Sequence, residues 1–373
     1  MIYLDNAATT RPCAEAVEAI TKTLTEDWGN PSAQYRFGID AARLLRSARQ
    51  SVAEALGAET DRVFFTSGGT EADNWAIFAA AERLGKRGRH IVTTAVEHHA
   101  VLRPMQKLQE RGFAVTYLQP DPLGRVSAES LQAALRPDTV LVSIMMVNNE
   151  SGAVMPIEAM AKLTHRLCPN ALFHTDAVQG FFKVPFRART LGADLISVSG
   201  HKIHAGKGVG ALYMAKNLPP YLHGGGQESG LRSGTENLPM IAGFGAACKA
   251  QLPKRMADIA EQTRLKKLLQ ALLSELDGVT LLGAQDAPHI VNLAVGGLRS
   301  QGLINALQER GFCVSAGSAC SKGHRSHVLE AMGVDARLID GSIRVSLSGE
   351  TTEEEIRAFA DALPQVIAAL SRR

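Results

Sequence analysis

Short hydrophobic segments alternate with amphipathic ones between about residues 60 and 215. The hydrophobic segments are rich in Val, Ile, Phe and Thr, which is typical of buried strands. In order along the chain they read RVFFTS, HIVTTA, AVTYL, TVLVSIM, ALFHTD, DLISVS and GALYM. Between the first five, segments such as TEADNWAIFAAAERLG and PIEAMAKLTHRLC carry apolar residues at helical spacing. This alternation predicts an α/β fold with a parallel-type sheet and helices on both of its faces.

The pattern changes after this region. A long helical segment is predicted over about 235–275, and strands and helices are mixed in the rest of the chain. The segments VTLLG, HIVNLAV, FCVSAG and SIRVSL are interpreted as strands, with helices near 300–310 and 325–333. The last helix opens with TTEEE, which is typical of a capping box. The mixture predicts a second, smaller α+β domain.

Composition adds limits on function and location. The chain has 373 residues, of which 45% are hydrophobic and 21% charged, as in ordinary globular proteins. A net charge of +3 gives no reason to expect a nucleic-acid partner. The sequence shows neither a signal peptide nor an apolar stretch long enough to span a membrane. Five scattered cysteines without a C-x-x-C motif favour reduced thiols. We therefore expect a cytoplasmic protein with no membrane partner.

Polar residues follow the predicted strands at the edge where open α/β sheets bind ligands. After RVFF, the segment TSGGTEADN offers a glycine-rich turn and Thr70 at a helix start, which suits a phosphate. Two histidines follow HIVTTA, and Asp176 ends the strand ALFHTD. The loop GHKIHAGKG between the last two strands carries Lys202 and Lys207. Each feature alone is also explained by a helix cap or a turn.

Together these residues point to one cofactor. Pyridoxal phosphate needs a lysine for its aldehyde, an acid for its ring nitrogen and donors for its phosphate. Nucleotide-binding motifs do not compete, because the pattern G-x-x-x-x-G-K-[ST] is missing and the glycines around Lys207 follow no strand-to-helix pattern. The sequence therefore predicts a pyridoxal phosphate site at this edge of the sheet.

Several long motifs, in the same order, give the sequence a resemblance to the cysteine desulfurases. These are pyridoxal-phosphate enzymes of the class V aminotransferase group. The motifs run nearly end to end: YLDNAATT, GNPSA, TSGGTEADN, EHHAV, VNNESGAVMPI, HTDAVQ, SGHKIHAGKGVGAL, HGGGQESGLRSGTEN, SAGSAC and SIRVSL. The resemblance implies the aspartate-aminotransferase-like fold, fold type I of the pyridoxal-phosphate-dependent transferases, and a homodimer. It also implies a large cofactor domain over 14–255 and a small domain built from 1–13 and 256–373.

The resemblance assigns cofactor contacts residue by residue. Lys202 matches the lysine that binds the cofactor covalently, and Asp176 matches the partner of the ring nitrogen. Gln179 matches the donor to the phenolic oxygen of the ring. His98 matches a catalytic histidine that stacks on the ring and moves protons. The phosphate contacts implied are Gly69, Thr70, Ser199 and His201, together with Thr235 reaching in from the other subunit.

The substrate contacts follow in the same way. Asn149 matches a residue that lies beside both cofactor and substrate. Arg344 and Asn30 match the pair that receives the substrate carboxylate, a task that suits a guanidinium because it can form two parallel hydrogen bonds.

One cysteine decides the reaction that the resemblance implies. The segment SAGSACSKGHRSHVLEAMG places Cys320 among small residues, with Lys322, His324 and Arg325 nearby to favour a thiolate. The implied reaction removes sulfur from L-cysteine, leaves L-alanine and holds the sulfur as a persulfide on Cys320. The sulfur then passes to an acceptor or scaffold protein for iron–sulfur cluster or thio-cofactor synthesis. Cys168, Cys248 and Cys313 are interpreted as structural thiols.

Other interpretations stay open at this point. Cys320, His324 and His327 have the spacing C-x3-H-x2-H, but a structural zinc site takes four ligands, so no permanent metal is expected. A class V aminotransferase or lyase would share Lys202 and Asp176 without needing the cysteine. A selenocysteine lyase and a non-catalytic assembly partner are further alternatives. Tyr35 stands where related proteins carry a histidine, and the segment after Cys320 is shorter than in some of them, so the acceptor is left open.

Overall fold

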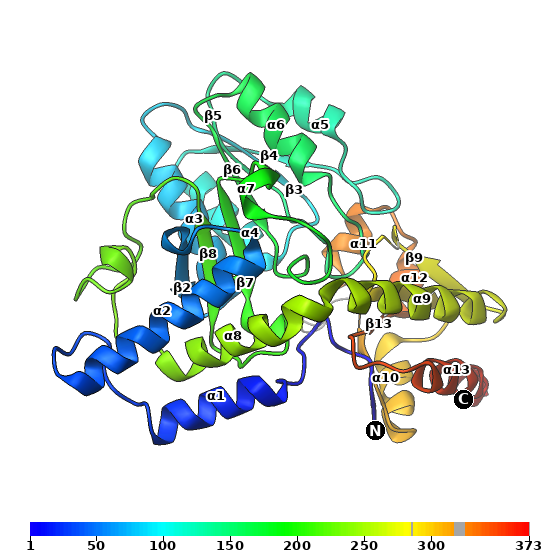
Figure 1. The fold of residues 1–373 in the computed structure, drawn as a ribbon. Helices are drawn as coiled ribbons and strands as arrows, with labels where there is room; N and C mark the ends of the chain where they lie inside the picture. The colour runs from blue at the N-terminus through cyan, green and yellow to red at the C-terminus, as the bar shows by residue number, and fades with distance from the viewer. Residues whose placement is uncertain (285, 317–324, 373) are drawn as a thin grey trace.

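The computed structural model describes residues 1–284, 286–316 and 325–372. Its largest feature is a seven-stranded sheet with helices packed on both faces, and a smaller unit that contains both chain termini lies beside it (Figure 1). The strands of the large sheet are β2 (Val63–Thr66), β3 (His90–Thr94), β4 (Ala114–Leu118), β5 (Thr139–Ser143), β6 (Leu172–Asp176), β7 (Leu195–Ser199) and β8 (Gly210–Met214). All seven strands predicted for this region are therefore present.

The order of the strands is β2-β8-β7-β6-β5-β3-β4. The pairs from β7 to β4 are parallel, whereas β8 is antiparallel to both of its neighbours. The reason lies in the connection between β7 and β8, which contains no crossover helix. A parallel pair needs a crossover of a dozen or more residues, so the short loop that carries Lys202 returns the chain in the opposite direction.

Eight helices accompany this sheet in the described part of the chain. Their bounds are α1 (Ala14–Thr25), α2 (Arg36–Leu56), α3 (Gly69–Leu84), α4 (His99–Glu110), α5 (Ala128–Ala134), α6 (Ile157–Leu167), α7 (Ala188–Leu191) and α8 (Leu238–Gln251). Alternate residues of each strand face opposite sides of the sheet. Phe64, for example, lies in the core that includes residues of α3 and α4, whereas Phe65 lies in the core that includes residues of α2, α6 and α8.

The smaller unit combines the two ends of the chain. Its four-stranded antiparallel sheet has the order β12 (Ser315–Ala316), β13 (Ser342–Ser346), β10 (Ile290–Val295) and β9 (Val279–Leu282). The first strand, β1 (Ile2–Tyr3), pairs with β11 (Phe312–Cys313). The remaining helices are α9 (Arg255–Ser274), α10 (Ser300–Glu309), α11 (His327–Ala331), α12 (Ala336–Asp340) and α13 (Glu353–Ser371). Leu4 belongs to the same buried core as residues of α9, α10 and α13. The division at residues 13/14 and 255/256 itself stays a prediction.

The C-terminal elements largely follow the hydrophobic pattern. The capping box predicted at the last helix is confirmed, because Glu355 N donates to Thr352 Oγ1 and Thr352 N donates to Glu355 Oε2. The helical segment predicted over about 235–275 is present as two helices, α8 and α9. A 3-10 turn at Leu252–Lys254 separates α8 from α9, because Pro253 has no amide hydrogen for a helix interior. None of the helices in the described ranges is long and apolar enough to cross a membrane.

The packing of α8 against α2 depends on a glycine. A methyl group added at Gly245 would lie 2.6 Å from Ala48 Cα and 2.9 Å from Ala48 Cβ. We therefore expect Gly245→Ala to destabilise the protein by about 1–3 kcal/mol, because the two helices must move apart. Gly302, inside α10, is the matched control, since a methyl group there meets nothing within 4 Å. Gly302→Ala is expected to be neutral or to stabilise by up to ~1 kcal/mol.

Denaturant unfolding of the two variants and the parent protein measures both effects. Equal stabilities for Gly245→Ala and Gly302→Ala would contradict the close approach of α2 and α8.

Candidate active site

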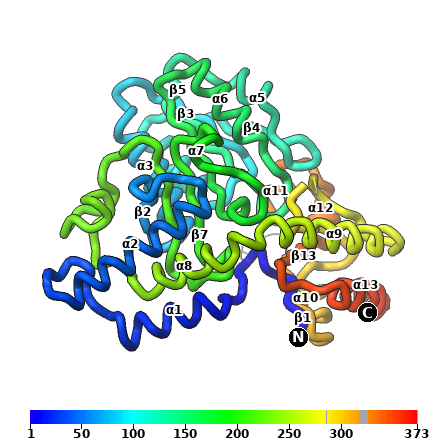
Figure 2. Tube along the Cα trace, in the orientation of Figure 1, coloured from blue at the N-terminus to red at the C-terminus, as the bar shows by residue number. Residues whose placement is uncertain are grey.

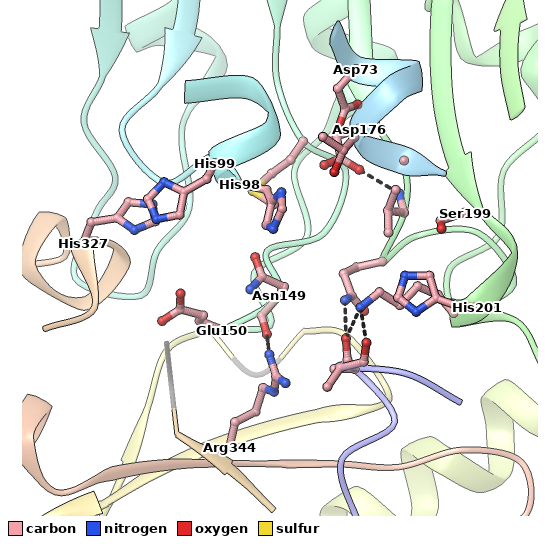
Figure 3. A pocket seen from close by; sticks show the side chains of 18 residues that line it. Asp73, His98, His99, Asn149, Glu150, Asp176, Ser199, His201, His327 and Arg344 are labelled. Atoms are coloured by element: carbon pink, nitrogen blue, oxygen red, sulfur yellow. Dashed lines mark hydrogen bonds between the residues drawn. The ribbon is translucent and has the colours of Figure 1, made fainter. Parts of the chain in front are cut away.

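A cavity of about 340 Å³ opens at the carboxyl ends of the large sheet's parallel strands (Figure 3). Side chains that follow β2, β3, β5, β6 and β7 form most of its wall, and the N-terminal segment and β13 of the smaller unit close it. Ten of the residues predicted from the sequence line this cavity: Gly69, Thr70, His98, Asn149, Asp176, Gln179, Ser199, His201, Lys202 and Arg344. The structure therefore brings together residues from six separate strands or the segments that follow them.

Lys202 lies in the 3-10 turn Gly200–Lys202, directly after β7. Its Nζ donates to the carbonyl oxygens of Ala7 at 2.6 Å and Ala8 at 2.7 Å. The N-terminal segment is also tied to this loop by its backbone, since Thr10 N donates to the carbonyl of His201 at 2.9 Å. The amine is thus held at the cavity wall by a segment that is distant in sequence.

Two carboxyl groups lie together at the deep end of the cavity (Figure 3). Asp176 ends β6 and accepts a hydrogen bond from Val178 N at 2.9 Å. Burial, followed by the nearby Asp73, raises the pKa of Asp176 to about 8, and burial raises the pKa of Asp73 to about 7. Among the described residues, Asp73 Oδ1 has no hydrogen-bond partner. The pair therefore favours a cationic or hydrogen-bond-donating ligand at this end.

His98 is held by its place at the start of α4. Its Nδ1 accepts the N–H of Ala100 at 3.1 Å, so the ring can carry a proton only on Nε2 when it is neutral. Burial and the nearby Lys202 lower the pKa of His98 to about 4. At neutral pH the ring is therefore uncharged, which suits stacking on another ring and exchanging a proton through Nε2.

The phosphate contacts predicted from the sequence gather around the start of α3. Gly69 and Thr70 form its first turn, and Ser199 and His201 line the same cavity. A side chain at Gly69 would lie 2.6 Å from Val178 Cγ2, so only glycine lets the helix start come this close to the strand end. Glu71 in the same turn pairs with Arg232 and accepts from Ser67 N. A helix N-terminus with adjacent hydroxyl groups suits an anion.

Arg344 reaches the cavity from β13 of the smaller unit. Its side chain is buried and donates to the carbonyl of Asn149 at 2.8 Å and to Asp5 Oδ1 at 3.0 Å. Nε of Arg344 has no hydrogen-bond partner within the part of the chain that the structure describes. A buried guanidinium with a spare donor suits the carboxylate of a small substrate.

Four titratable residues of the wall were not predicted as site residues from the sequence: Asp73, His99, Glu150 and His327. Asp73 follows Thr70 by three residues, so helical spacing gave a signal for it. Glu150 follows Asn149 directly, is buried, and accepts a hydrogen bond from Ser326 Oγ. Burial raises the pKa of Glu150 to about 7. No sequence signal placed the ring of His327 against His99, with 4.8 Å between the ring centres.

Three predicted site residues are not part of this cavity as described. Asn30 is exposed in the loop between α1 and α2, where its side chain accepts from Ser32 N. Thr235 is exposed and lines a smaller cavity of about 170 Å³. Cys320 lies outside the described residues, as do Lys322 and His324.

His327, the third residue of the C-x3-H-x2-H spacing, bonds through Nε2 to the carbonyl of Glu97 at 3.0 Å. Among the described residues no cluster of His, Cys, Asp and Glu suits a metal ion.

The raised pKa values of Asp73 and Asp176 make the free energy of unfolding depend on pH. Folding raises the pKa of Asp73 and Asp176 above the usual value of 3.8, so the folded protein keeps protons that the unfolded chain releases. The contribution of this pair to the stability of the cofactor-free protein should therefore fall as the pH rises from about 4 to about 8. We expect Asp73→Asn to be more stable than the parent protein at pH 8, by roughly 1–3 kcal/mol, and to lose this advantage toward pH 4.

Denaturant unfolding at several pH values measures this difference. Asp138→Asn serves as the control, because Arg136 lowers the pKa of this surface carboxyl. The control variant should not gain stability at pH 8. A parent protein whose stability rises between pH 5 and 8 as much as that of Asp73→Asn would contradict the assignment.

Comparisons with known proteins agree with this geometry. The aminotransferase class-V family model matches residues 2–359. A cysteine desulfurase of Trichormus azollae is 42% identical over 98% of this chain and 93% of its own length. The cysteine desulfurase IscS of Methanosarcina thermophila is 40% identical over 98% of this chain and 92% of its own length. A solved NifS-like protein shares 37% identity at a TM-score of 0.93, over 99% of this chain and 100% of that chain.

A second solved structure, a NifS-like protein from Rickettsia africae, has a TM-score of 0.87 at 31% identity and covers 99% of both chains. The predicted fold class, fold type I of the pyridoxal-phosphate-dependent transferases, is confirmed by these similarities together with the mostly parallel sheet. The chain belongs to the aminotransferase class-V family.

Proposed function

We propose that the protein is a pyridoxal-phosphate-dependent cysteine desulfurase. It converts L-cysteine to L-alanine, with the sulfur held as a persulfide on Cys320 and passed to an acceptor protein. The observation that carries this proposal is the meeting of Lys202, Asp176 and Arg344 in one cavity beside the start of α3. A similar protein supports the substrate, since a solved structure at 32% identity and a TM-score of 0.82 is SspA in complex with cysteine.

The residues of the cavity fit the cofactor. Asp176 accepts a hydrogen bond from Val178 N, and burial, followed by the nearby Asp73, raises its pKa. A protonated ring nitrogen would supply a cationic partner for this carboxyl. The start of α3 with Thr70 and Ser199 would hold the phosphate, and Lys202 would hold the aldehyde carbon. When bound, pyridoxal phosphate supplies a ring that accepts the electron pair left on the substrate's α-carbon.

The chain's own residues then have distinct tasks. Arg344 binds and orients the substrate carboxylate through its free Nε–H and adjacent N–H groups. The Lys202 amine removes the α-proton and later returns a proton, and Ala7 and Ala8 keep it in place through their carbonyls. His98, neutral at physiological pH, exchanges a proton at Nε2. The Cys320 thiolate attacks the substrate sulfur, so a persulfide forms on the enzyme and alanine is left.

Homodimer formation belongs to the same proposal. Five large apolar side chains are exposed on α1, on α2 and on the loop between them: Val17, Leu24, Trp28, Tyr35 and Ile39. Trp28 is 68% exposed and Tyr35 64%, and both helices pack against α8 at one flank of the molecule (Figure 2). An exposed apolar surface of this kind is typical of a protein interface. Asn30 belongs to the same loop, and it would reach an active site together with Thr235 in the assembled dimer.

Several finer points remain part of the proposal. The acceptor protein, its use in iron–sulfur cluster or thio-cofactor synthesis, and a cytoplasmic location are expectations from the resemblance and the composition. A class V aminotransferase and a selenocysteine lyase are the alternatives on the same fold. The first would not need Cys320, and competition between cysteine and selenocysteine would separate the second.

The first test combines a spectrum with product assays. The purified protein should show a cofactor absorption band that changes on addition of L-cysteine, while sulfide and alanine form in the presence of a reductant. Cys320→Ala should lose sulfide release by at least 100-fold and keep the band, because the cysteine acts on sulfur alone, and nucleophile removal commonly costs several orders of magnitude. Lys202→Ala should lose both the covalent linkage and product formation.

Cys313→Ala is the matched control, because this partly exposed thiol lies on β11 near the same segment. It should retain activity. Sulfide release that persists in Cys320→Ala would contradict the mechanism and favour another class V enzyme.

A separate test addresses the dimer. Trp28→Glu places a charge in the exposed apolar surface and should convert much of the protein to monomer, as measured by light scattering at micromolar concentration. Leu123→Glu, at a side chain that is 43% exposed and lies outside that surface, is the control and should leave the dimer intact. A parent protein that is monomeric throughout the concentration range would contradict the proposal.

A further inference from the structure

His289 is a buried residue that contacts Gln179, which is part of the cavity wall. It lies directly before β10, is only 1% exposed, and does not line the cavity itself. Its Nε2 is 3.2 Å from Oε1 of Gln179. Nε2 of Gln179 donates to the carbonyl of Ala7 at 2.8 Å, and Lys202 Nζ donates to the same oxygen. An unbroken chain of hydrogen bonds therefore joins His289 to the lysine of the site.

The donors and acceptors of this chain allow one assignment. The carbonyl oxygen of Ala7 can only accept, so Gln179 must present its NH2 group there and its Oε1 to His289. His289 must then donate through Nε2. Its Nδ1 carries no proton in that tautomer and has no hydrogen-bond partner among the described residues.

The surroundings of His289 agree with a neutral ring. Burial lowers the pKa of His289 well below its usual value, and four nearby cations act in the same direction: Lys183, Lys266, Arg344 and Lys202. A neutral imidazole has one donor and one acceptor nitrogen, which is what the bond to Gln179 requires.

The backbone around His289 is fixed by two further contacts. Lys266 Nζ of α9 donates to the carbonyl of Ala287 at 2.5 Å, and Leu347 N donates to the carbonyl of His289 at 2.8 Å. The imidazole is therefore presented to Gln179 by ordered elements of the smaller unit rather than by a free loop.

We propose that His289 is a positioning residue that fixes the orientation of the Gln179 amide. When Oε1 faces His289, one hydrogen of the NH2 group bonds to the carbonyl of Ala7, and the other is left for the phenolic oxygen of the cofactor. The carbonyl of Ala7 favours the same orientation, so His289 is the second of two contacts that hold the amide. Without His289, Oε1 loses this bond and the NH2 group is held less firmly toward the cofactor. This inference rests on the proposed function, because it needs the cofactor in the cavity.

The test is a pH titration of the absorption band of the bound cofactor. A donor to the phenolic oxygen favours its ionised form, so the proton of the neighbouring lysine–cofactor linkage leaves at a lower pH. Loss of a well-oriented donor should therefore raise the midpoint of the titration. We expect His289→Phe and His289→Leu each to raise it by roughly half a pH unit to one unit, the size of one hydrogen bond.

A conservative replacement of His289 and a double variant with Gln179 distinguish orientation of the amide from a packing role of the imidazole. His289→Gln can place an N–H near the position of the imidazole Nε2 and should titrate like the parent protein. Gln179→Leu should shift the midpoint at least as far as His289→Phe, and the double variant should match Gln179→Leu alone. His90→Phe is the control for loss of a buried histidine, since both ring nitrogens of His90 bond to threonines on neighbouring strands of the sheet. It should not move the midpoint.

The outcomes distinguish the inference from the proposed function. A parent protein without any cofactor band overturns both. A normal band with an unshifted midpoint in His289→Phe and His289→Leu overturns the inference alone. Additive shifts in the double variant, or a shift in His289→Gln as large as in His289→Phe, overturn it as well.

Discussion

The carbonyl oxygens of Ala7 and Ala8 hold the Lys202 amine, and the rest of the site depends on this contact. It joins the two units of the molecule. The N-terminal segment pairs with β11, and Ala7 N donates to Ser346 Oγ at the end of β13. The same few residues then cross to the loop after β7. Two backbone hydrogen bonds, Ser346 N to the carbonyl of Leu4 and Thr10 N to the carbonyl of His201, tie β13 and the loop of Lys202 to this segment. The position of the lysine relative to Arg344 is therefore set in part by the N-terminal segment.

Burial gives the cavity an unusual distribution of charge. It raises the pKa values of Asp73, Asp176 and Glu150 and lowers those of His98 and His201. Both kinds of group are driven toward their neutral forms, since a charge without a partner is costly away from water. A site of this kind gains most from a ligand that carries its own charges, with anionic groups for the helix start and Arg344 and a cationic or donor group for the carboxyls. Pyridoxal phosphate with an amino acid has this pattern of charges.

The helices and strands that the sequence predicted are those marked by a pattern of neighbouring residues. Strands such as β5 and β8 are mostly hydrophobic runs, and the capping box of α13 is a four-residue signal. The break at Pro253 was missed because apolar spacing continues across it, although proline itself is a local signal. The antiparallel direction of β8 follows from its short connection to β7, which is itself visible in the sequence.

The residues of the site also fall into those that a local sequence pattern predicts and those that it does not. Lys202, Asp176 and Thr70 end or follow strands, so their meeting follows from the rule that strand ends of one sheet lie together. Arg344 came only from the resemblance, because it belongs to a different sheet. Asp73 needed only the helical spacing after Thr70. His289 and Glu150 could not have been found, since the bonds to Gln179 and Ser326 join positions more than 100 residues apart.

The cysteines of the described part of the chain support the role given to Cys320. Burial raises the pKa of Cys13, Cys168 and Cys248, which keeps these thiols protonated and poorly nucleophilic. A sulfur-transfer enzyme needs the opposite, a thiolate that both the substrate and a protein acceptor can reach. Such a group cannot be part of a packed core, because a core excludes the acceptor and disfavours the charge. The sequence around Cys320 consists of small and polar residues, which agrees with the proposal that this cysteine supplies the thiol.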